Sequence, residues 1–150
     1  MKGDDLPAGD HIVRYVKPSM IEEDGTANGA EFRLRPNRPD ETGLSVNWLE
    51  VFDADKAQQI AQVRRLYRLS VKRTGRFAEL NIGEVRAKVA EELESLRILH
   101  DPLAAEGVFA DDNSHAEITG LPSGDSPEAD MIGDMIAECV IGMHAAIEET

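Results

Sequence analysis

The chain of 150 residues has a single cysteine, Cys139, and few aromatic side chains. One cysteine excludes a disulfide framework and any zinc site built from several cysteines. Phe, Trp and Tyr together make up 5% of the residues, so no stacking platform for single-stranded nucleic acid is visible. We therefore expect a cytoplasmic protein that folds around one hydrophobic core without disulfides or metal.

Long apolar segments and familiar catalytic motifs are also missing. No apolar run approaches the roughly 20 residues of a membrane-spanning helix. The N-terminal stretch MKGDDLPAGD is acidic and polar, unlike a secretory signal or a transit peptide. The sequence has no P-loop and no Gly-x-Gly-x-x-Gly, His-Glu-x-x-His or Gly-x-Ser-x-Gly motif. We expect no membrane association, no metal and no cofactor.

Positive charge is absent from the last third of the chain. Residues 101–150 carry 12 Asp and Glu but no Lys or Arg, whereas residues 56–78 contain no acidic residue. The net charge of −13 makes nucleic acid an improbable partner, because its phosphates repel an acidic protein. The middle segment nevertheless concentrates six cations, which are Arg64, Arg65, Arg68, Lys72, Arg73 and Arg76. They either pair with the acidic last third or form a patch for a phosphate or an acidic partner.

The hydrophobic patterning predicts one α+β domain, in which a small, mainly antiparallel sheet packs against about three helices. We expect residues 1–10 to form a loose arm and residues 11–150 to form the domain. Alternating apolar residues predict strands over residues 11–16, 31–35, 44–49, 76–82, 96–100 and 115–119. Helices are predicted from Asp53 or Asp55 to about Ser70, after Asn81, and after Ser126.

The last helix has the strongest pattern. Ser126 suits the N-cap and Pro127 the first helical position. Apolar residues then recur at helical spacing as far as Ile147, which predicts one long helix. Cys139 lies in this stripe, so we interpret it as a core residue and not as a nucleophile.

Polar residues on the predicted strands are the first candidates for chemistry. His100 and His115 could serve as general acid and base at neutral pH, with Arg14 and Asn47 orienting an anionic substrate. This arrangement would suit a phosphoester or nucleotide substrate. It requires the histidines, including His11, to converge, which the sequence does not show.

A third possibility follows from the order of residues along the chain. Arg14, Ser45 and Glu117 each lie on a predicted strand, and they follow the Arg…Ser…Glu order of one class of ADP-ribosyltransferases. In that class the Arg and Ser help to hold NAD and the Glu activates the acceptor. Here the Glu belongs to His115-Ala-Glu117, where that class has a paired Glu or Gln two residues before it.

Several stretches resemble a widespread bacterial family of small uncharacterised proteins. They are DHIVRYVKPSM (10–20), LSVNWLE (44–50), RFAELNIG (76–83), HDP (100–102), SHAEI (114–118) and IGDMIAEC (132–139). The resemblance spans most of the chain and implies a single compact domain. It implies no activity and no site residues.

The leading functional hypothesis from the sequence is a non-enzymatic interaction protein, an accessory or regulatory subunit of a bacterial multi-protein system. Segregated charge favours fast, oriented docking. We expect binding through basic residues 56–76 and acidic residues 101–150, to a protein partner or within a homodimer. The cations expected to make the contact are Arg64, Arg65, Arg68, Lys72 and Arg73.

Overall fold

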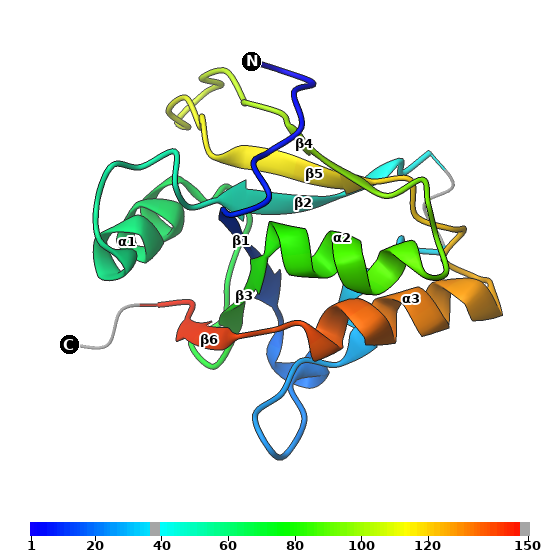
Figure 1. Ribbon diagram of the computed structural model, residues 1–150. Helices are drawn as coiled ribbons and strands as arrows, with labels where there is room; N and C mark the ends of the chain where they lie inside the picture. Colours follow the sequence, from blue (N-terminus) through cyan, green and yellow to red (C-terminus); the bar gives the residue numbers. More distant parts are fainter. Residues whose placement is uncertain (37–39, 148–150) are drawn as a thin grey trace.

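The computed structural model describes residues 1–36 and 40–147 and contains one antiparallel sheet (Figure 1). Its strands are β1 (His11–Val16), β2 (Gly43–Trp48), β3 (Arg76–Asn81), β4 (Arg97–His100), β5 (His115–Thr119) and β6 (Gly142–Ala145). The order across the sheet is β4-β5-β2-β1-β3-β6, so β4 and β6 form its edges. With three helices, this is the single α+β domain that the patterning predicts.

The three helices are α1 (Lys56–Leu66), α2 (Ile82–Ala90) and α3 (Pro127–Glu138). Each begins where the sequence predicts, because a polar side chain caps its first turn. Asp55, Asn81 and Ser126 each accept a hydrogen bond from the backbone N–H group three residues later in the chain. None of the helices in the described ranges is long and apolar enough to cross a membrane.

The helices cover opposite faces of the sheet. Successive residues of a strand point to opposite faces. Accordingly Ile12 belongs to a core beneath α2 and α3, whereas Val13 belongs to a second core with Ile60 and Val63 of α1. In Figure 1, α2 and α3 lie side by side across the front, with α1 at one end of the sheet.

The N-terminal arm is paired with the sheet, although we expected it to be loose. The Gly3 and Leu6 N–H groups donate to the carbonyl groups of His100 and Ile98 in β4, at 2.7 and 3.0 Å. The Leu6 side chain is buried in the larger core. The arm thus covers one edge of the sheet, which limits pairing with other chains.

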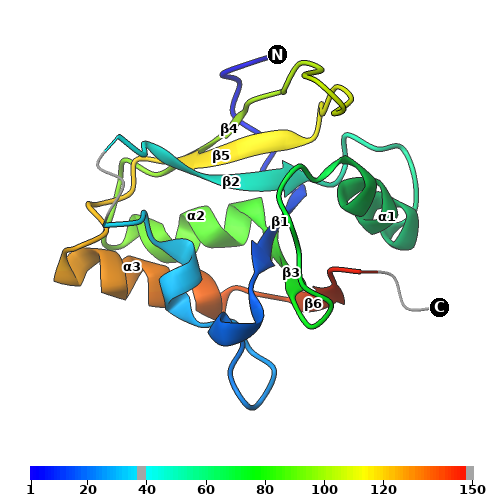
Figure 2. The ribbon, with the colours of Figure 1, turned by 180° about the vertical axis from the view of Figure 1, so that it is seen from behind.

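Two predicted elements are wrong. Residues 31–35 form no strand, because the chain enters the short 3-10 helix η2 (Gly29–Phe32). From behind (Figure 2), this segment lies against α3, which buries Phe32 there instead. The last helix does not reach Ile147 but ends at Glu138, and the chain then forms β6 against β3. The hydrophobic periodicity predicted too long a helix because Met143 fits both the apolar stripe of a helix and a strand that begins at Gly142.

Candidate functional site

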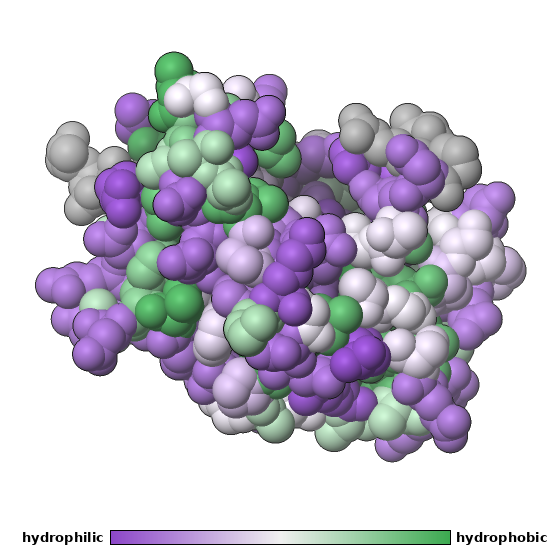
Figure 3. All heavy atoms as spheres, turned by 90° about the horizontal axis from the view of Figure 1, so that it is seen from above, coloured by the Kyte–Doolittle hydropathy of each residue, from purple (hydrophilic) through white to green (hydrophobic). Residues whose placement is uncertain are grey.

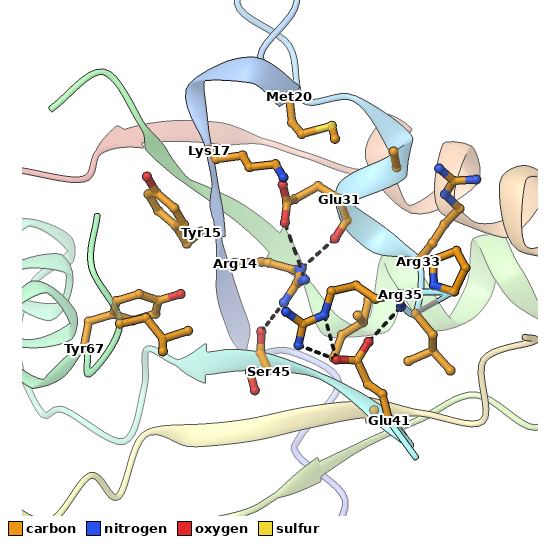
Figure 4. Close-up of a pocket in the computed structure, with 16 residues that line it drawn as sticks. Arg14, Tyr15, Lys17, Met20, Glu31, Arg33, Arg35, Glu41, Ser45 and Tyr67 are labelled. Atoms are coloured by element: carbon orange, nitrogen blue, oxygen red, sulfur yellow. Dashed lines mark hydrogen bonds and ion pairs between the residues drawn. The ribbon is translucent and has the colours of Figure 1, made fainter. Parts of the chain in front are cut away.

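A cavity of about 380 Å³ lies where β1 and β2 separate (Figure 4). Only two residue pairs join these strands, Ile12 with Trp48 and Val13 with Asn47. Beyond these two pairs the Arg14 side chain lies between β1 and β2. Its hydrogen bonds take the place of those that a continued strand ladder would make. The cavity is therefore a consequence of the split between two neighbouring central strands.

Arg14 anchors the wall of this cavity. Its Nη1 donates to the Ser45 carbonyl oxygen at 2.8 Å, and its Nε donates to the Glu31 carbonyl oxygen at 2.7 Å. Burial lowers the pKa of Arg14 from its usual value, while the nearby Glu31 carboxylate opposes that change. A guanidinium held by two carbonyls at the base of a cavity is a fixed positive charge.

Glu31 provides the cavity with a poorly satisfied carboxyl group. Its Oε1 lies 3.5 Å from Nη2 of Arg14, and its Oε2 is buried without a hydrogen-bond partner. Burial raises the pKa of Glu31 above its usual value, although Arg14 acts against the rise. A buried polar atom without a partner is costly and is often found at a functional site.

Further charges surround the opening. Lys17, Arg33 and Arg35 line the cavity together with Glu41. Arg33 pairs with Asp130 of α3, and Arg35 donates to Glu41 through its backbone and side chain. Burial alone would raise the pKa of Glu41, but the hydrogen bonds from Arg35 hold it below its usual value. With Arg14, the wall carries four cations against the two carboxyl groups of Glu31 and Glu41.

Tyr15 and Tyr67 form the aromatic side of the cavity. Their ring centroids lie 5.9 Å apart, and Phe77 packs edge-on against both rings. The Tyr15 hydroxyl accepts a hydrogen bond from the Lys72 backbone N–H at 2.9 Å. Burial raises the pKa of Tyr67. Two rings fixed in this way, tilted by 49° to each other, offer apolar surface beside the charged wall.

Of Arg14, Ser45 and Glu117, which the chain order grouped together, Arg14 and Ser45 line the cavity, whereas Glu117 does not. Ser45 is the cross-strand partner of Glu117 in the β2–β5 ladder, and its carbonyl accepts from Arg14. A Cβ atom added to Gly43 would lie 2.9 Å from Oε2 of Glu117. The Glu117 carboxylate therefore lies against Gly43, which itself lines the cavity.

His115 extends this group on the same face of the sheet. Its Nε2 lies 3.2 Å from the Ser45 Oγ, and its Nδ1 lies 2.8 Å from the Asp101 carbonyl oxygen. The Asp101 carboxylate is also close, with Oδ2 3.2 Å from the same Nδ1. Asp101, His115 and Ser45 thus form a continuous chain of polar contacts that ends at the cavity.

The structure does not bring His100 and His115 together. His100 is the partner of Ala116, one residue after His115, so the two imidazoles point to opposite faces of the sheet. His100 instead packs edge-on against Trp48, with ring centroids 5.3 Å apart. An acid and base pair on one substrate needs both groups within reach, which this register prevents.

Asn47 and His11 also have polar partners outside the cavity. The buried Asn47 amide donates to Ser114 Oγ at 2.8 Å and to Asp112 Oδ2 at 3.3 Å. His11 Nδ1 lies 2.6 Å from the Glu50 carboxylate. Neither side chain lines the cavity. Of the catalytic candidates His100, His115, Arg14 and Asn47, only Arg14 lines the cavity, and His115 contacts the lining residue Ser45.

The basic cluster does not pair with the acidic last third within the described ranges. Arg64 donates to the Ala145 carbonyl, Arg65 to Gln62, and Arg68 to the carbonyls of Ala104 and Ala110. No carboxylate of the described residues lies within 4.0 Å of these arginines or of Lys72 and Arg73. The cations are thus still available to a partner.

Cys139 is less deeply buried than the core position expected from the sequence. Cys139 is the C-cap of α3 and is half-buried, with Sγ 3.5 Å from the Met135 carbonyl oxygen. Burial raises the pKa of this thiol, which disfavours a reactive thiolate. In the described part of the chain, no group of three His, Cys, Asp or Glu side chains is placed to hold a metal ion.

Most of the cavity residues were not suggested by the sequence, among them Glu31, Tyr15 and Tyr67. Glu31 lies in a segment that reads as a strand, and Tyr67 lies in a helical apolar stripe. Comparison with models of protein families, with curated proteins and with solved structures finds no match. The site must therefore be interpreted from its own geometry.

Proposed function

We propose that the protein is an ADP-ribosyltransferase-like enzyme that binds NAD in the Arg14 cavity. The observation that supports the proposal is the hydrogen bond from Arg14 to the Ser45 carbonyl at the cavity, with Glu117 as the cross-strand partner of Ser45.

The wall of the cavity suits a dinucleotide. The pyrophosphate of NAD carries two negative charges, and four cations line the cavity, of which Arg14, Arg33 and Arg35 each pair with a carboxylate. Tyr15 and Tyr67 offer an aromatic surface for a nicotinamide or adenine ring. A volume of about 380 Å³ falls in the range of small-molecule sites and would hold part of the ligand, with the remainder outside.

The chemistry assigns a separate role to each residue. In ADP-ribosyl transfer the bond between C1′ of the ribose and the nicotinamide nitrogen breaks, and nicotinamide leaves with the electron pair. The acceptor, either water or a side chain of another molecule, forms the new bond at C1′. Glu117 takes the proton of the acceptor, while Arg14 and Ser45 keep the ligand in place.

The experiment that tests the proposal is release of nicotinamide from NAD. Wild-type protein is incubated with NAD, and free nicotinamide is measured by chromatography. We expect Glu117→Gln to reduce the rate at least about 100-fold, the usual effect of losing a general base, while NAD affinity changes little. Glu106→Gln, at an exposed loop residue, is the matched control.

Two results would contradict the proposal. One is the absence of both NAD binding and nicotinamide release in the wild-type protein. The other is a release rate that Glu117→Gln leaves unchanged. Loss of NAD affinity in Glu117→Gln without further loss of rate would place Glu117 in binding and not in catalysis.

A second candidate function is docking to an acidic partner protein, as the charge pattern predicts. The observation in its favour is the absence of ion pairs at Arg64, Arg65, Arg68, Lys72 and Arg73 within the described residues. Seen from above (Figure 3), the surface is mostly hydrophilic, with hydrophobic side chains in small separate patches. Docking on this side would therefore depend on charge and not on a large apolar area.

The sharpest test of docking changes exposed cations that bond to no backbone carbonyl. Arg65, Lys72 and Arg73 are exposed, whereas Arg64 and Arg68 tie α1 to other segments. We expect the triple change of these exposed residues to Glu to abolish salt-sensitive capture of an acidic protein. The triple change Arg64→Glu, Arg65→Glu and Arg68→Glu would also disturb the fold. Unchanged capture by the exposed triple variant would remove this candidate.

A further inference from the structure

The hydroxyl group of Ser45 lies away from the cavity contact that its carbonyl group makes. The carbonyl oxygen accepts from Arg14, whereas the hydroxyl points away from Arg14 (Figure 4). Leu44 and Val46 are buried in the core beneath α2 and α3, so Ser45 between them faces the opposite side of the sheet. Ser45 is exposed on that side, where a molecule in solution can reach it.

His115 lies beside the Ser45 hydroxyl in a defined tautomer. Its Nε2 lies 3.2 Å from Oγ of Ser45. Its Nδ1 lies 2.8 Å from the Asp101 carbonyl oxygen and 3.2 Å from Oδ2 of the Asp101 carboxylate. Both Asp101 oxygens can only accept, so Nδ1 carries the proton of the neutral ring. Nε2 then keeps a lone pair, which can take the hydroxyl proton of Ser45.

We infer that Ser45, His115 and Asp101 form a nucleophilic triad that transfers acyl groups from esters or thioesters to water. A nucleophile within hydrogen-bond reach of a base, with the base oriented by a third group, is the arrangement that nucleophilic catalysis requires. The three residues come from β2, from β5 and from the loop after β4, and the His115 side chain is only 12% exposed. The reaction needs no NAD, so the inference goes beyond the function proposed above.

The reaction has two steps that share one base. In the first step Oγ of Ser45 forms a bond to the acyl carbon, and its proton moves to Nε2 of His115. The bond from the acyl carbon to the alcohol or thiol breaks, and the leaving group takes that proton. In the second step water attacks the acyl-serine ester, its proton passes through His115, and the Ser45 hydroxyl is restored. His115 is thus a catalytic residue, and Asp101 is a positioning residue.

Glu117 selects the charge of the ester. It is the cross-strand partner of Ser45, so its side chain lies on the same face of the sheet. The Cβ atoms of such partners are about 5 Å apart. A carboxylate at this distance repels an anionic acyl or leaving group and attracts a positively charged one. We therefore assign the substrate class as small esters or thioesters that are uncharged or positively charged.

The first experiment detects the nucleophile with a fluorophosphonate, a reagent that reacts with activated serines. Peptide mass spectrometry locates the label and follows its rate of formation. We expect the label on Ser45, and we expect His115→Ala to slow its formation at least about 100-fold, the usual effect of losing a general base. Ser19 is exposed and lies in a different segment, so Ser19→Ala is the matched control and should be labelled at the wild-type rate.

The second experiment measures turnover. Thiol release is followed for acetylthiocholine, which is positively charged, and for the uncharged S-ethyl thioacetate. We expect Ser45→Ala to abolish release from both. We expect the wild-type protein to favour acetylthiocholine by about threefold, the effect of one exposed ion pair, and Glu117→Gln to bring the two rates together.

The role of Asp101 is tested by a pH profile, which a merely structural role would not move. A carboxylate beside an imidazole favours its protonated form. In Asp101→Asn the loss of labelling rate on acidification should therefore occur at a lower pH than in the wild type. Asp53→Asn, at an exposed residue, should leave the profile unchanged. Nitrogen-15 spectra of labelled histidine should place the His115 proton on Nδ1.

Four results would overturn the inference. The first is a wild-type protein in which Ser45 is labelled no faster than Ser19, and the second is a labelling rate that His115→Ala leaves unchanged. The third is a nitrogen-15 spectrum with the His115 proton on Nε2. The fourth is labelling of Ser45 without thiol release from either thioester. None of these measurements uses NAD, so their failure is distinguishable from failure of the proposed function.

Discussion

Two glutamates on opposite faces of the sheet are both largely buried, but their surroundings differ. Glu79 of β3 has a partner for each carboxylate oxygen, because His144 Nε2 lies 2.8 Å from Oε1 and Lys56 Nζ pairs with Oε2. Among the described residues Glu31 forms an ion pair with Arg14 alone, at 3.5 Å, and one of its carboxylate oxygens has no hydrogen-bond partner. The Glu79 cluster ties α1, β3 and β6 together, whereas Glu31 faces a cavity.

The difference shows which buried charge serves the fold and which serves the site. Burial alone would raise both pKa values. Hydrogen bonds from Lys56 and His144 hold the pKa of Glu79 below its usual value, whereas burial wins at Glu31 and raises its pKa. The Glu79 carboxylate, with both oxygens paired, has no acceptor left for a ligand. The Glu31 carboxylate has one.

The largest expected effect is the loss of stability when Glu79, which pairs with Lys56 and His144, is replaced. Glu79→Ala leaves Lys56 and His144 without their carboxylate and removes a side chain that packs beneath α1. We expect it to lower the free energy of unfolding by about 2–4 kcal/mol, less than for a fully desolvated pair because Lys56 is partly exposed. Urea unfolding at neutral pH measures the loss, with Glu106→Ala as the exposed control. A loss equal to that of the control would show that the cluster does not stabilise the fold.

The second prediction concerns acid. The pKa of Glu79 is lower in the folded than in the unfolded state, so its contribution is present above the unfolded value of about 4.3. That contribution is lost as the pH falls from there through the folded pKa. Unfolding free energies of the wild type and Glu79→Gln should therefore converge between neutral pH and about pH 3. A constant difference over this range contradicts the assignment.

The third prediction concerns Glu31, whose ionisation should change the stability in the opposite direction to that of Glu79. The raised pKa of Glu31 means that its ionised form opposes folding above the unfolded pKa, so the penalty is largest at neutral pH. We expect Glu31→Gln to leave the protein equally stable or to stabilise it by up to about 1 kcal/mol. The more positive cavity should bind pyrophosphate about fivefold more tightly. Weaker pyrophosphate binding in calorimetry would show that Glu31 supports the ligand.

The smallest effect on stability is expected at Gly43. A methyl group there meets the far end of the Glu117 side chain, which can swing away, and the backbone carbonyl of Ile118 at 3.1 Å. We expect Gly43→Ala to change the free energy of unfolding by no more than about 1 kcal/mol, in line with surface substitutions. It should nevertheless reduce nicotinamide release, because the Glu117 carboxylate moves. Full activity in this variant would argue that Glu117 need not lie against Gly43.

The sequence predicts well wherever local chemistry decides the structure. The three N-caps, Asp55, Asn81 and Ser126, act within one helical turn, and the alternation of β1 and β5 reports which face is buried. The end of α3 was missed because it depends on pairing between β6 and β3, more than 60 residues apart. Periodicity within one segment contains no information about such a partner.

The candidate site also combines features that the local sequence predicts with features that depend on tertiary contacts. Chain order suggested a group of Arg14, Ser45 and Glu117, and strand alternation could place each of them on a sheet. It could not show that Arg14 fills the gap between β1 and β2, or that Glu31 from η2 would lie beside it. It also paired His100 with His115, because their opposite faces follow only from the register of β4 against β5.

The most direct test of the NAD site is a titration of nitrogen-15-labelled protein with ADP-ribose followed by NMR. The proposed function predicts amide shifts confined to residues around the cavity, with Arg14, Ser45 and Glu117 among them, and weaker binding in Arg14→Lys. Lys keeps the charge but cannot bridge two carbonyls as the guanidinium does. The absence of shifts, or shifts confined to Arg65, Lys72 and Arg73, would contradict the assignment of this cavity as the ligand site.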